Sequence, residues 1–128
     1  MKILFDTHVF LWALNDDPRL SQRVRNLFVD SDNIVLLSAA SIWEIVAKAQ
    51  AGKLPFPQPA ARYLRSQLQK TSVEVLPILL AHVLRVEGLP DHHKDPFDRI
   101  LLAQALEEKI PIASADKVLR RYPVEVIW

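Results

Sequence analysis

The stretch HHKDPFDRILLAQALEEKIPIASAD, from His92 to Asp116, decides the fold because it places three aspartates around a helix and the strand that follows it. Asp95 followed by Pro96 is typical of a helix start, since aspartate caps the exposed amides and proline fits the first helical position. We predict a helix over residues 96–109 and a strand over residues 110–113.

Asp98 lies on the apolar side of this predicted helix, at about 100° per residue. That side also contains Leu101, Leu102, Ala105 and Leu106, and the polar side contains Gln104, Glu107 and Glu108. An ionised carboxylate on an apolar side needs a cation, a metal ion, hydrogen bonds or a raised pKa, because desolvation of an unpaired charge is costly. Alternatively, Asp98 could only satisfy the positive end of the helix.

The composition sets broad limits. The chain has 128 residues, and we predict a single domain over residues 1–128 with a substantial core. Half of the residues are hydrophobic, which argues against disorder. Lys and Arg number 16 against 15 Asp and Glu, so the bulk charge neither requires nor excludes a nucleic-acid partner. The absence of cysteine removes thiol chemistry and disulfides.

No part of the sequence has the character of a membrane segment. No apolar run approaches the roughly 20 residues that span a bilayer. Asp6 and His8 interrupt the apolar start that would otherwise resemble a signal peptide. We therefore predict a soluble, cytoplasmic protein.

Short apolar runs alternate with helical segments along the chain. The predicted strands are residues 3–5, 34–37, 73–78, 110–113 and 124–128. The predicted helices outside the stretch quoted above are residues 7–14, 21–29, 41–51, 60–68 and 79–86, with a short one at 116–121. This alternation predicts an α/β fold with a central, mainly parallel sheet of about five strands, covered by helices on both faces. Pro77 favours an edge position for the third strand.

Several acids follow the predicted strands. Asp6 follows the first strand, Glu44 the second and Asp116 the fourth, while Asp98 opens the helix that leads into the fourth. In open parallel sheets the functional site lies beyond the carboxyl ends of the strands. These four acids could therefore converge at one edge of the sheet.

Each acid also has a purely structural explanation. Asp6 could belong to a turn or a helix cap, and Asp95 and Asp116 could also cap helices. The segment from Ser41 to Glu44 fits a capping box, and Lys48 could pair with Glu44 one turn later.

If the acids converge, their mutual repulsion requires bound divalent cations. Oxygen ligands suit Mg²⁺ or Mn²⁺ rather than zinc. One or two such ions can activate a water molecule and stabilise the leaving oxygen of a phosphodiester.

The remaining polar residues receive simpler interpretations. The adjacent His92 and His93 lack the spacing of a histidine metal site, so we expect a solvated loop or a phosphate contact with Lys94. Arg99 is near the acids in sequence and could face phosphates. The same holds for Lys117, Arg120 and Arg121. The three tryptophans are expected in the core or at an interface.

Four segments carry a resemblance to a known family: ILFDTHVFLW at 3–12, SAASIWEI at 38–45, HHKDPFDRILLAQA at 92–105 and IASADKVL at 112–119. In this order, and over essentially the whole chain, they resemble the PIN-domain nucleases and, among these, the VapC toxins of bacterial toxin-antitoxin pairs. The resemblance implies a compact α/β/α fold and a metal-dependent endoribonuclease that leaves 5′-phosphate and 3′-hydroxyl ends.

The resemblance also implies roles for the acids. Asp6, Glu44, Asp98 and Asp116 match the four family acids. Asp6 and Asp98, assisted by Asp116, would bind Mg²⁺ (or Mn²⁺), and Glu44 would orient or deprotonate the attacking water.

Further implications concern auxiliary residues and partners. Asp95 belongs to the HxDPFDR form of the third segment and would bind metal or position Arg99. The implied partners are an RNA substrate, a small cognate antitoxin and a second copy in a homodimer. The competing hypothesis is a catalytically silent PIN-like module that binds RNA or a protein, and retention of all four acids argues against it.

Overall fold

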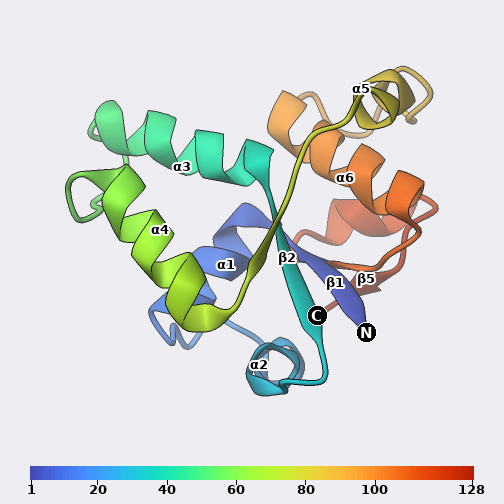
Figure 1. Ribbon diagram of the computed structural model, residues 1–128. Coiled ribbons are helices and arrows are strands. Elements are labelled where there is room, and N and C mark those ends of the chain that lie inside the picture. Colours follow the sequence, from blue (N-terminus) through green and yellow to red (C-terminus); the bar gives the residue numbers. More distant parts are fainter.

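The computed structural model describes residues 1–128 and contains a five-stranded sheet in which all neighbouring strands are parallel. Its strand order is β3-β2-β1-β4-β5 (Figure 1). The strands are β1 (Lys2–Phe5), β2 (Ile34–Ser38), β3 (Glu74–Leu76), β4 (Ile112–Ala113) and β5 (Val126–Ile127). The predicted α/β class is confirmed, and β3 occupies the edge that Pro77 indicated.

The sheet has a hydrophobic core on each face, because successive residues of a strand point to opposite sides. Ile3 and Phe5 belong to one buried cluster, whereas Leu4 between them belongs to the other. In β2, Val35 and Leu37 likewise face the first cluster, and Leu36 faces the second. Burial on both faces explains why these strands are continuous apolar runs in the sequence.

Four helices cover the first face. They are α1 (Thr7–Leu14), α2 (Gln22–Val29), α3 (Ala39–Gln50) and α4 (Ala60–Thr71). Each contributes buried side chains to the first cluster, among them Phe10, Val24, Ile45 and Leu64. None of the helices in the chain combines the length and hydrophobicity needed to cross a lipid bilayer.

The other face is covered by α5 (Leu80–Val86), α6 (Pro96–Glu108) and the 3-10 helix η1 (Lys117–Arg121), so α3 and α6 flank the strands in Figure 1. Leu101, Leu102 and Ala105 of α6 are buried, as predicted. Gln104 was predicted on the polar side but is fully buried. The prediction was wrong because α5 packs on that side of α6, where Gln104 Nε2 donates to the carbonyl of Pro77 at 3.2 Å.

The start of α3 differs from the prediction. Ser38, the last residue of β2, caps the helix, since its Oγ accepts a hydrogen bond from the amide of Ala40 at 3.0 Å. The predicted capping box from Ser41 to Glu44 is therefore wrong. Ser41 is buried instead and accepts a hydrogen bond from the hydroxyl of Thr7 at 2.8 Å, which joins α3 to α1.

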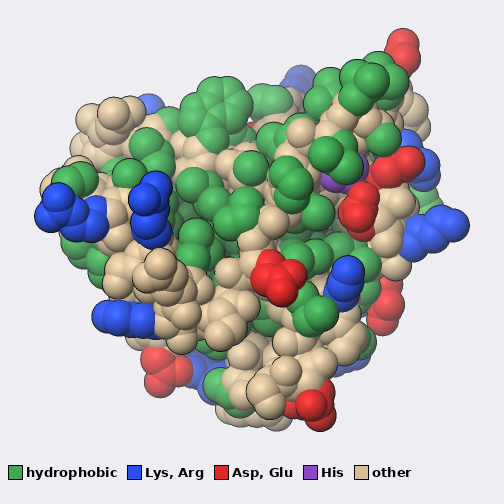
Figure 2. All heavy atoms as spheres, viewed as in Figure 1, with side chains coloured by type: hydrophobic (Ala, Val, Ile, Leu, Met, Phe, Trp, Pro, Cys, Tyr) green, Lys and Arg blue, Asp and Glu red, His purple; other side chains and the backbone are tan.

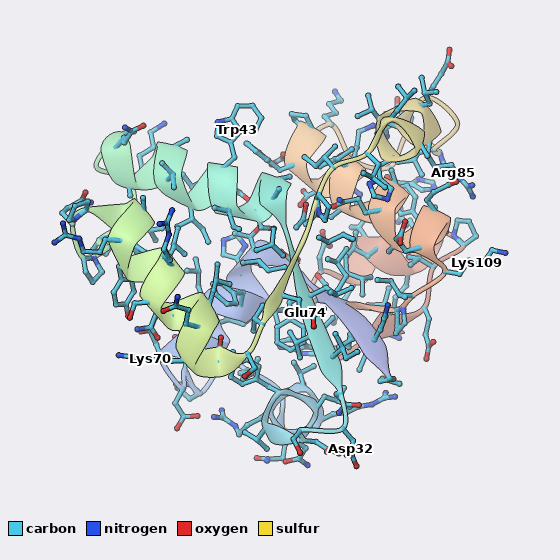
Figure 3. The ribbon with its side chains drawn as sticks, in the orientation of Figure 1. Asp32, Trp43, Lys70, Glu74, Arg85 and Lys109 are labelled. Carbon is cyan, nitrogen blue, oxygen red and sulfur yellow. The ribbon has the colours of Figure 1, made fainter.

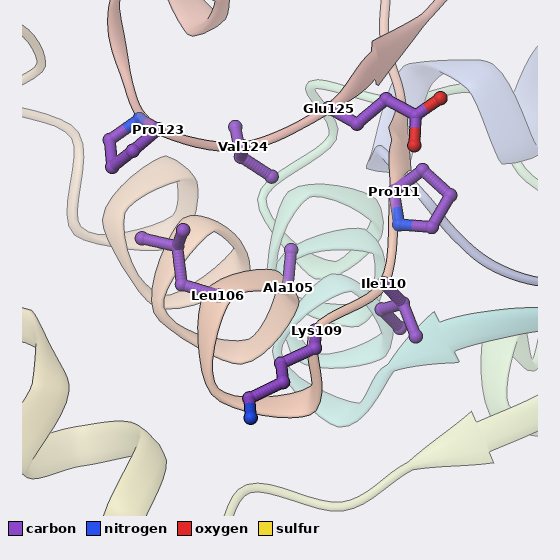
Figure 4. Close-up of a pocket in the computed structure, with 8 residues that line it drawn as sticks. All are labelled: Ala105, Leu106, Lys109, Ile110, Pro111, Pro123, Val124 and Glu125. Atoms are coloured by element: carbon purple, nitrogen blue, oxygen red, sulfur yellow. The ribbon is translucent and has the colours of Figure 1, made fainter.

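A hollow of about 270 Å³ lies between α6 and the segment that leads into β5 (Figure 4). Pro111 in its wall precedes β4, so the hollow lies at the amino end of that strand. Lys109 and Glu125 are its only charged residues. This hollow therefore offers no group of acids.

Candidate functional site

The strand register brings Asp6 beside Ser114 at the carboxyl edge of the sheet. Phe5 of β1 pairs with Ala113 of β4, and the amide of Asp6 donates to the carbonyl of Ala113 at 3.0 Å. The next residue on each strand therefore lies at the edge, and the Ser114 hydroxyl donates to Asp6 Oδ2 at 2.7 Å. Sequence analysis did not identify Ser114, although its place one residue after the fourth strand could have indicated it.

Asp6 is a partly buried carboxylate that also caps α1. Its Oδ1 accepts a hydrogen bond from the amide of His8 at 3.3 Å, so the cap that we considered as an alternative is present. Burial raises the pKa of Asp6 above its usual value, despite the hydrogen bond from Ser114 and the nearby His8, which lower it. The charge of Glu44 adds to the increase. Asp6 is thus a carboxylate for which a cation would be favourable.

Glu44 reaches the same edge from α3. It is only 7% exposed. Its Oε2 lies 2.7 Å from the Nζ of Lys48, so the predicted ion pair is confirmed. The hydrogen bond from Lys48 to Glu44 raises the pKa of Lys48, and the charges of Asp95 and Asp98 add to this effect.

Asp98 lies in the first turn of α6. Asp95 caps that helix as predicted, accepting a hydrogen bond from the amide of Phe97 at 2.8 Å, and Pro96 occupies the first turn. Burial raises the pKa of Asp98 to about 6, with contributions from the charges of Asp95, Asp6 and Asp116. No hydrogen bond is among the influences that offset this increase. The nearby His93 offsets part of the increase, but Asp98 has no hydrogen-bond partner for its charge.

Asp116 follows β4 and caps η1. Its Oδ1 accepts a hydrogen bond from the amide of Val118 at 2.9 Å, and its Oδ2 lies 2.8 Å from Nε2 of His93. Burial alone would raise the pKa of Asp116, but these two hydrogen bonds and the nearby His93 outweigh it and lower the pKa. The solvated loop predicted for the two histidines is wrong for His93, whose side chain is only 10% exposed, whereas His92 is exposed.

Arg99 has a structural role in the loop before α6. Its guanidinium donates to the carbonyls of Pro90, His93 and Val86 at 3.1, 3.3 and 3.2 Å. The guanidinium therefore holds this loop and the end of α5 against α6, and Arg99 is joined to Asp95 only through the backbone, where its amide donates to the Asp95 carbonyl at 3.1 Å. The structure places Arg99 on backbone oxygens, not toward a phosphate.

The four predicted acids influence one another although they come from four parts of the chain. Asp98 is influenced by Asp6 and Asp116, and Asp6 by Glu44. As the side chains are placed, no group of three or more His, Asp or Glu residues is arranged to hold a metal ion. The donor set nevertheless fits a hard cation: all four are carboxylates, and two have raised pKa values. Mg²⁺ often keeps several waters and takes only one or two carboxylates, so it needs no closed cage.

Basic residues adjoin this edge. A hollow of about 300 Å³ is lined by Ser114, Asp116, Lys117, Arg120 and Trp128, with Ala115. Lys117 and Arg120 thus lie beside Asp116, the fourth acid. The edge therefore combines acidic and basic side chains.

Comparison with known proteins gives related sequences and folds. Ribonuclease VapC16 of Mycobacterium tuberculosis is 37% identical to this chain over 79 residues, which span 57% of this chain and 56% of that protein. The match thus covers little more than half the length of that relative.

Solved structures of similar fold cover nearly the entire chain. VapBC2 of Rickettsia felis, bound to a promoter DNA fragment, has a TM-score of 0.73 at 14% identity and covers 100% of this chain and 99% of the other. DNA-bound VapBC of Salmonella typhimurium has a TM-score of 0.70 at 16% identity, over 99% and 97% of the two chains. The family model of the PIN domain matches residues 3–125, and the chain therefore belongs to the PIN-domain family.

Proposed function

We propose that this protein is a VapC-type toxin, an endoribonuclease that hydrolyses RNA phosphodiesters with Mg²⁺ or Mn²⁺ in the cytoplasm. The observation that carries the proposal is the convergence of Asp6, Glu44, Asp98 and Asp116 at the carboxyl edge of the sheet, with Asp98 held near a pKa of about 6 without a compensating hydrogen bond. The relation to ribonuclease VapC16 supports the same class of reaction.

The four acids would have different roles in the reaction. Asp6 and Asp98 are the carboxylates with raised pKa values, and they would be the principal metal ligands, with Asp116 beside them. A divalent cation at this edge would make the attacking water more acidic and stabilise the leaving oxygen. Glu44 would orient the water or accept its proton, and Lys48 would hold the Glu44 carboxylate in place.

RNA would be bound through its phosphates. Lys117 and Arg120 line the hollow that is also lined by Asp116. An RNA strand that crosses this edge would therefore meet basic side chains next to the acids. Since the net formal charge of the chain is only +1, this attraction must be local.

The partner that silences the activity would be a small antitoxin, as the VapBC complexes of similar fold suggest. We propose that a helical antitoxin segment occupies a hollow of about 420 Å³ between α3 and α4, where Figure 2 shows exposed hydrophobic atoms. Ile42, Val46, Leu64 and Leu68 supply its apolar walls, and Arg65 at its rim would favour an acidic segment. Leu68→Asp should abolish co-purification with the product of a neighbouring small reading frame, which the unchanged chain should retain.

A second copy of the chain would cover the exposed apolar face of α5. Leu80, Val83 and Leu84 are 74%, 52% and 63% exposed. Figure 2 shows hydrophobic atoms at the upper right, where Figure 1 places α5. Beside them Trp43, 66% exposed, projects from α3 (Figure 3) and meets the edge of Phe97 at 5.1 Å between ring centres.

Self-association suits this face because its hollow of about 380 Å³ is lined by Ala40, Trp43, Ile78, Val83, Pro96, Phe97 and Ile100, none of them charged. Leu84→Glu should convert a dimer to a monomer by light scattering after size exclusion. Val29→Glu on α2, equally apolar and 74% exposed, is the control that should stay dimeric.

The activity is tested with a pool of structured RNAs, purified protein and Mg²⁺ or Mn²⁺. Cleavage should disappear with EDTA and fall by at least about 100-fold in Asp6→Asn and Asp98→Asn. Asp32→Asn, an exposed carboxylate far from the edge (Figure 3), is the control that should cleave normally. Cleavage that survives both acid substitutions would contradict the assignment. RNA binding without cleavage by any variant would favour the silent PIN-like module.

A further inference from the structure

The side chain of His93 bridges an acid of the proposed site and a buried tyrosine. Its Nε2 lies 2.8 Å from Oδ2 of Asp116, and its Nδ1 lies 3.0 Å from the hydroxyl oxygen of Tyr122. Tyr122 is only 3% exposed and belongs to the core on the α6 face. The bridge therefore connects the hydrophobic core to the edge of the sheet.

The hydrogen-bond partners define where the protons lie. The ionised carboxylate of Asp116 can only accept, so Nε2 of His93 donates to it. The Tyr122 oxygen already accepts from the amide of His92 at 3.2 Å, and its own proton is then available to Nδ1 of His93. When His93 is the neutral Nε2–H tautomer, every donor in this hydrogen-bond network has an acceptor.

This arrangement fixes the Asp116 carboxylate at both oxygens. His93 holds Oδ2, while the amide of Val118 holds Oδ1. The amide of Asp116 in turn donates to the Ser114 oxygen at 3.1 Å, and the Ser114 hydroxyl donates to Asp6. The orientation of Asp116 is thus linked through Ser114 to that of Asp6.

The backbone of His93 is also held in place. Arg99 of α6 donates to the His93 carbonyl, to the Pro90 carbonyl of the same loop and to the Val86 carbonyl at the end of α5. His93 is therefore fixed by its own backbone and by Tyr122, which leaves it little freedom to follow a moving carboxylate.

We infer that His93 is a positioning residue: supported by Tyr122, it holds Asp116 in the orientation that the site uses. The inference rests on the proposed metal-dependent function. Partners that orient a metal-binding carboxylate typically contribute 10- to 100-fold to metal affinity or activity. A preset carboxylate loses less freedom when a cation or a phosphate arrives.

The test compares four variants. His93→Ala removes the bridge, His93→Gln keeps a donor and an acceptor on a shorter side chain, and Tyr122→Phe removes only the hydroxyl. His92→Ala is the control for ring packing: it removes the His92 ring, which lies edge-on to Tyr122 at 5.0 Å between ring centres, but keeps the backbone amide that donates to the Tyr122 oxygen and leaves the His93 hydrogen bonds in place. Thermal melting of each variant checks folding, and His93→Gln keeps the test valid if the alanine variant is unstable.

Mn²⁺ affinity by calorimetry and RNA cleavage at saturating RNA are the functional readouts. We expect His93→Ala to lose 10- to 100-fold, Tyr122→Phe less, His93→Gln to recover part of the loss, and His92→Ala to match the unchanged chain. Wild-type values for His93→Ala in both measurements would overturn the inference.

The tautomer of His93 gives a readout that needs no activity. ¹⁵N NMR of the metal-free protein should show a single Nε2–H tautomer, and Tyr122→Phe should release a mixture of tautomers. If the unchanged chain cleaves no RNA, the proposed function fails, while this spectrum and the Mn²⁺ affinities still decide the role of His93. A mixture of tautomers in the unchanged chain would overturn the bridge itself.

Discussion

Asp116 and Asp98 lie at the same edge of the sheet, but the fold treats their charges in opposite ways. Asp116 accepts hydrogen bonds at both carboxylate oxygens, and these lower its pKa. Asp98 is half-buried among like charges, and its pKa is raised to about 6 without a compensating hydrogen bond. The fold alone stabilises the first carboxylate, whereas the second lacks a partner within the chain.

This difference shows that hydrogen bonds can fix one part of an acidic site while a carboxylate in another part has no hydrogen-bond partner. Hydrogen bonds through Ser114 and His93 fix the half of the site that contains Asp6 and Asp116. Asp98 supplies the charge that a cation would neutralise. In the metal-free protein this charge reduces the stability of the fold, as is common at functional sites.

The largest expected effect is stabilisation by a divalent cation. At a Mn²⁺ concentration about 100 times the Kd, the unfolding free energy should rise by about 2.7 kcal/mol, which is roughly 10 °C in Tm for a domain of this size. Asp98→Asn should lose most of this shift, because it removes a principal ligand. Thermal melts at pH 7.5 with and without Mn²⁺ measure the effect, and Asp32→Asn should shift like the unchanged chain. Equal shifts in Asp98→Asn would show that the uncompensated charge does not serve metal binding.

A smaller effect is expected without metal. The pKa of Asp98 is about 6 in the folded state and near its ordinary 3.8 when unfolded. Its neutral form therefore favours folding at low pH, and this stability is lost as the pH rises through 6. Two pKa units correspond to about 3 kcal/mol, which solvent screening of a half-exposed group reduces to about 1 kcal/mol.

Because asparagine is always neutral, the Asp98→Asn variant should be more stable than the unchanged protein by about 1 kcal/mol at pH 7.5 in EDTA. The difference should approach zero near pH 4. Urea unfolding at the two pH values measures it, and a gain that is equal at both would mean that the effect is not electrostatic.

Much of this site could be predicted from local sequence. Asp6 and Asp116 each follow an apolar strand, and Asp95 with Pro96 marks the start of α6, so the edge of the sheet was predictable from residues close together in the chain. The resemblance of the segment around Glu44 to the family then favoured a functional role over an ordinary ion pair.

The contacts between distant residues could not be predicted in this way. The hydroxyl of Tyr122 meets His93 across 29 positions, and Ser114 meets Asp6 across 108. Such pairs depend on strand register and loop path, which no local pattern contains. Gln104 was misplaced for the same reason, since α5 covers a side of α6 that helical periodicity alone marks as polar.

The smallest expected effect concerns Asp95, which contributes in two ways to the difference between Asp98 and Asp116. Asp95 caps α6 and also raises the pKa of Asp98 through its charge. Asp95→Ser keeps a capping oxygen and should change stability by only a few tenths of a kcal/mol, whereas Asp95→Ala should lose about 1 kcal/mol. Both substitutions remove the like charge, so both should lower the pKa of Asp98, as ¹³C NMR titration of its carboxyl group can measure. Burial is the larger cause of the raised pKa, and we therefore expect it to stay above 3.8 in both variants. A fall to the ordinary value would mean that Asp98 differs from Asp116 through the charge of one neighbour, and not through its place in the fold.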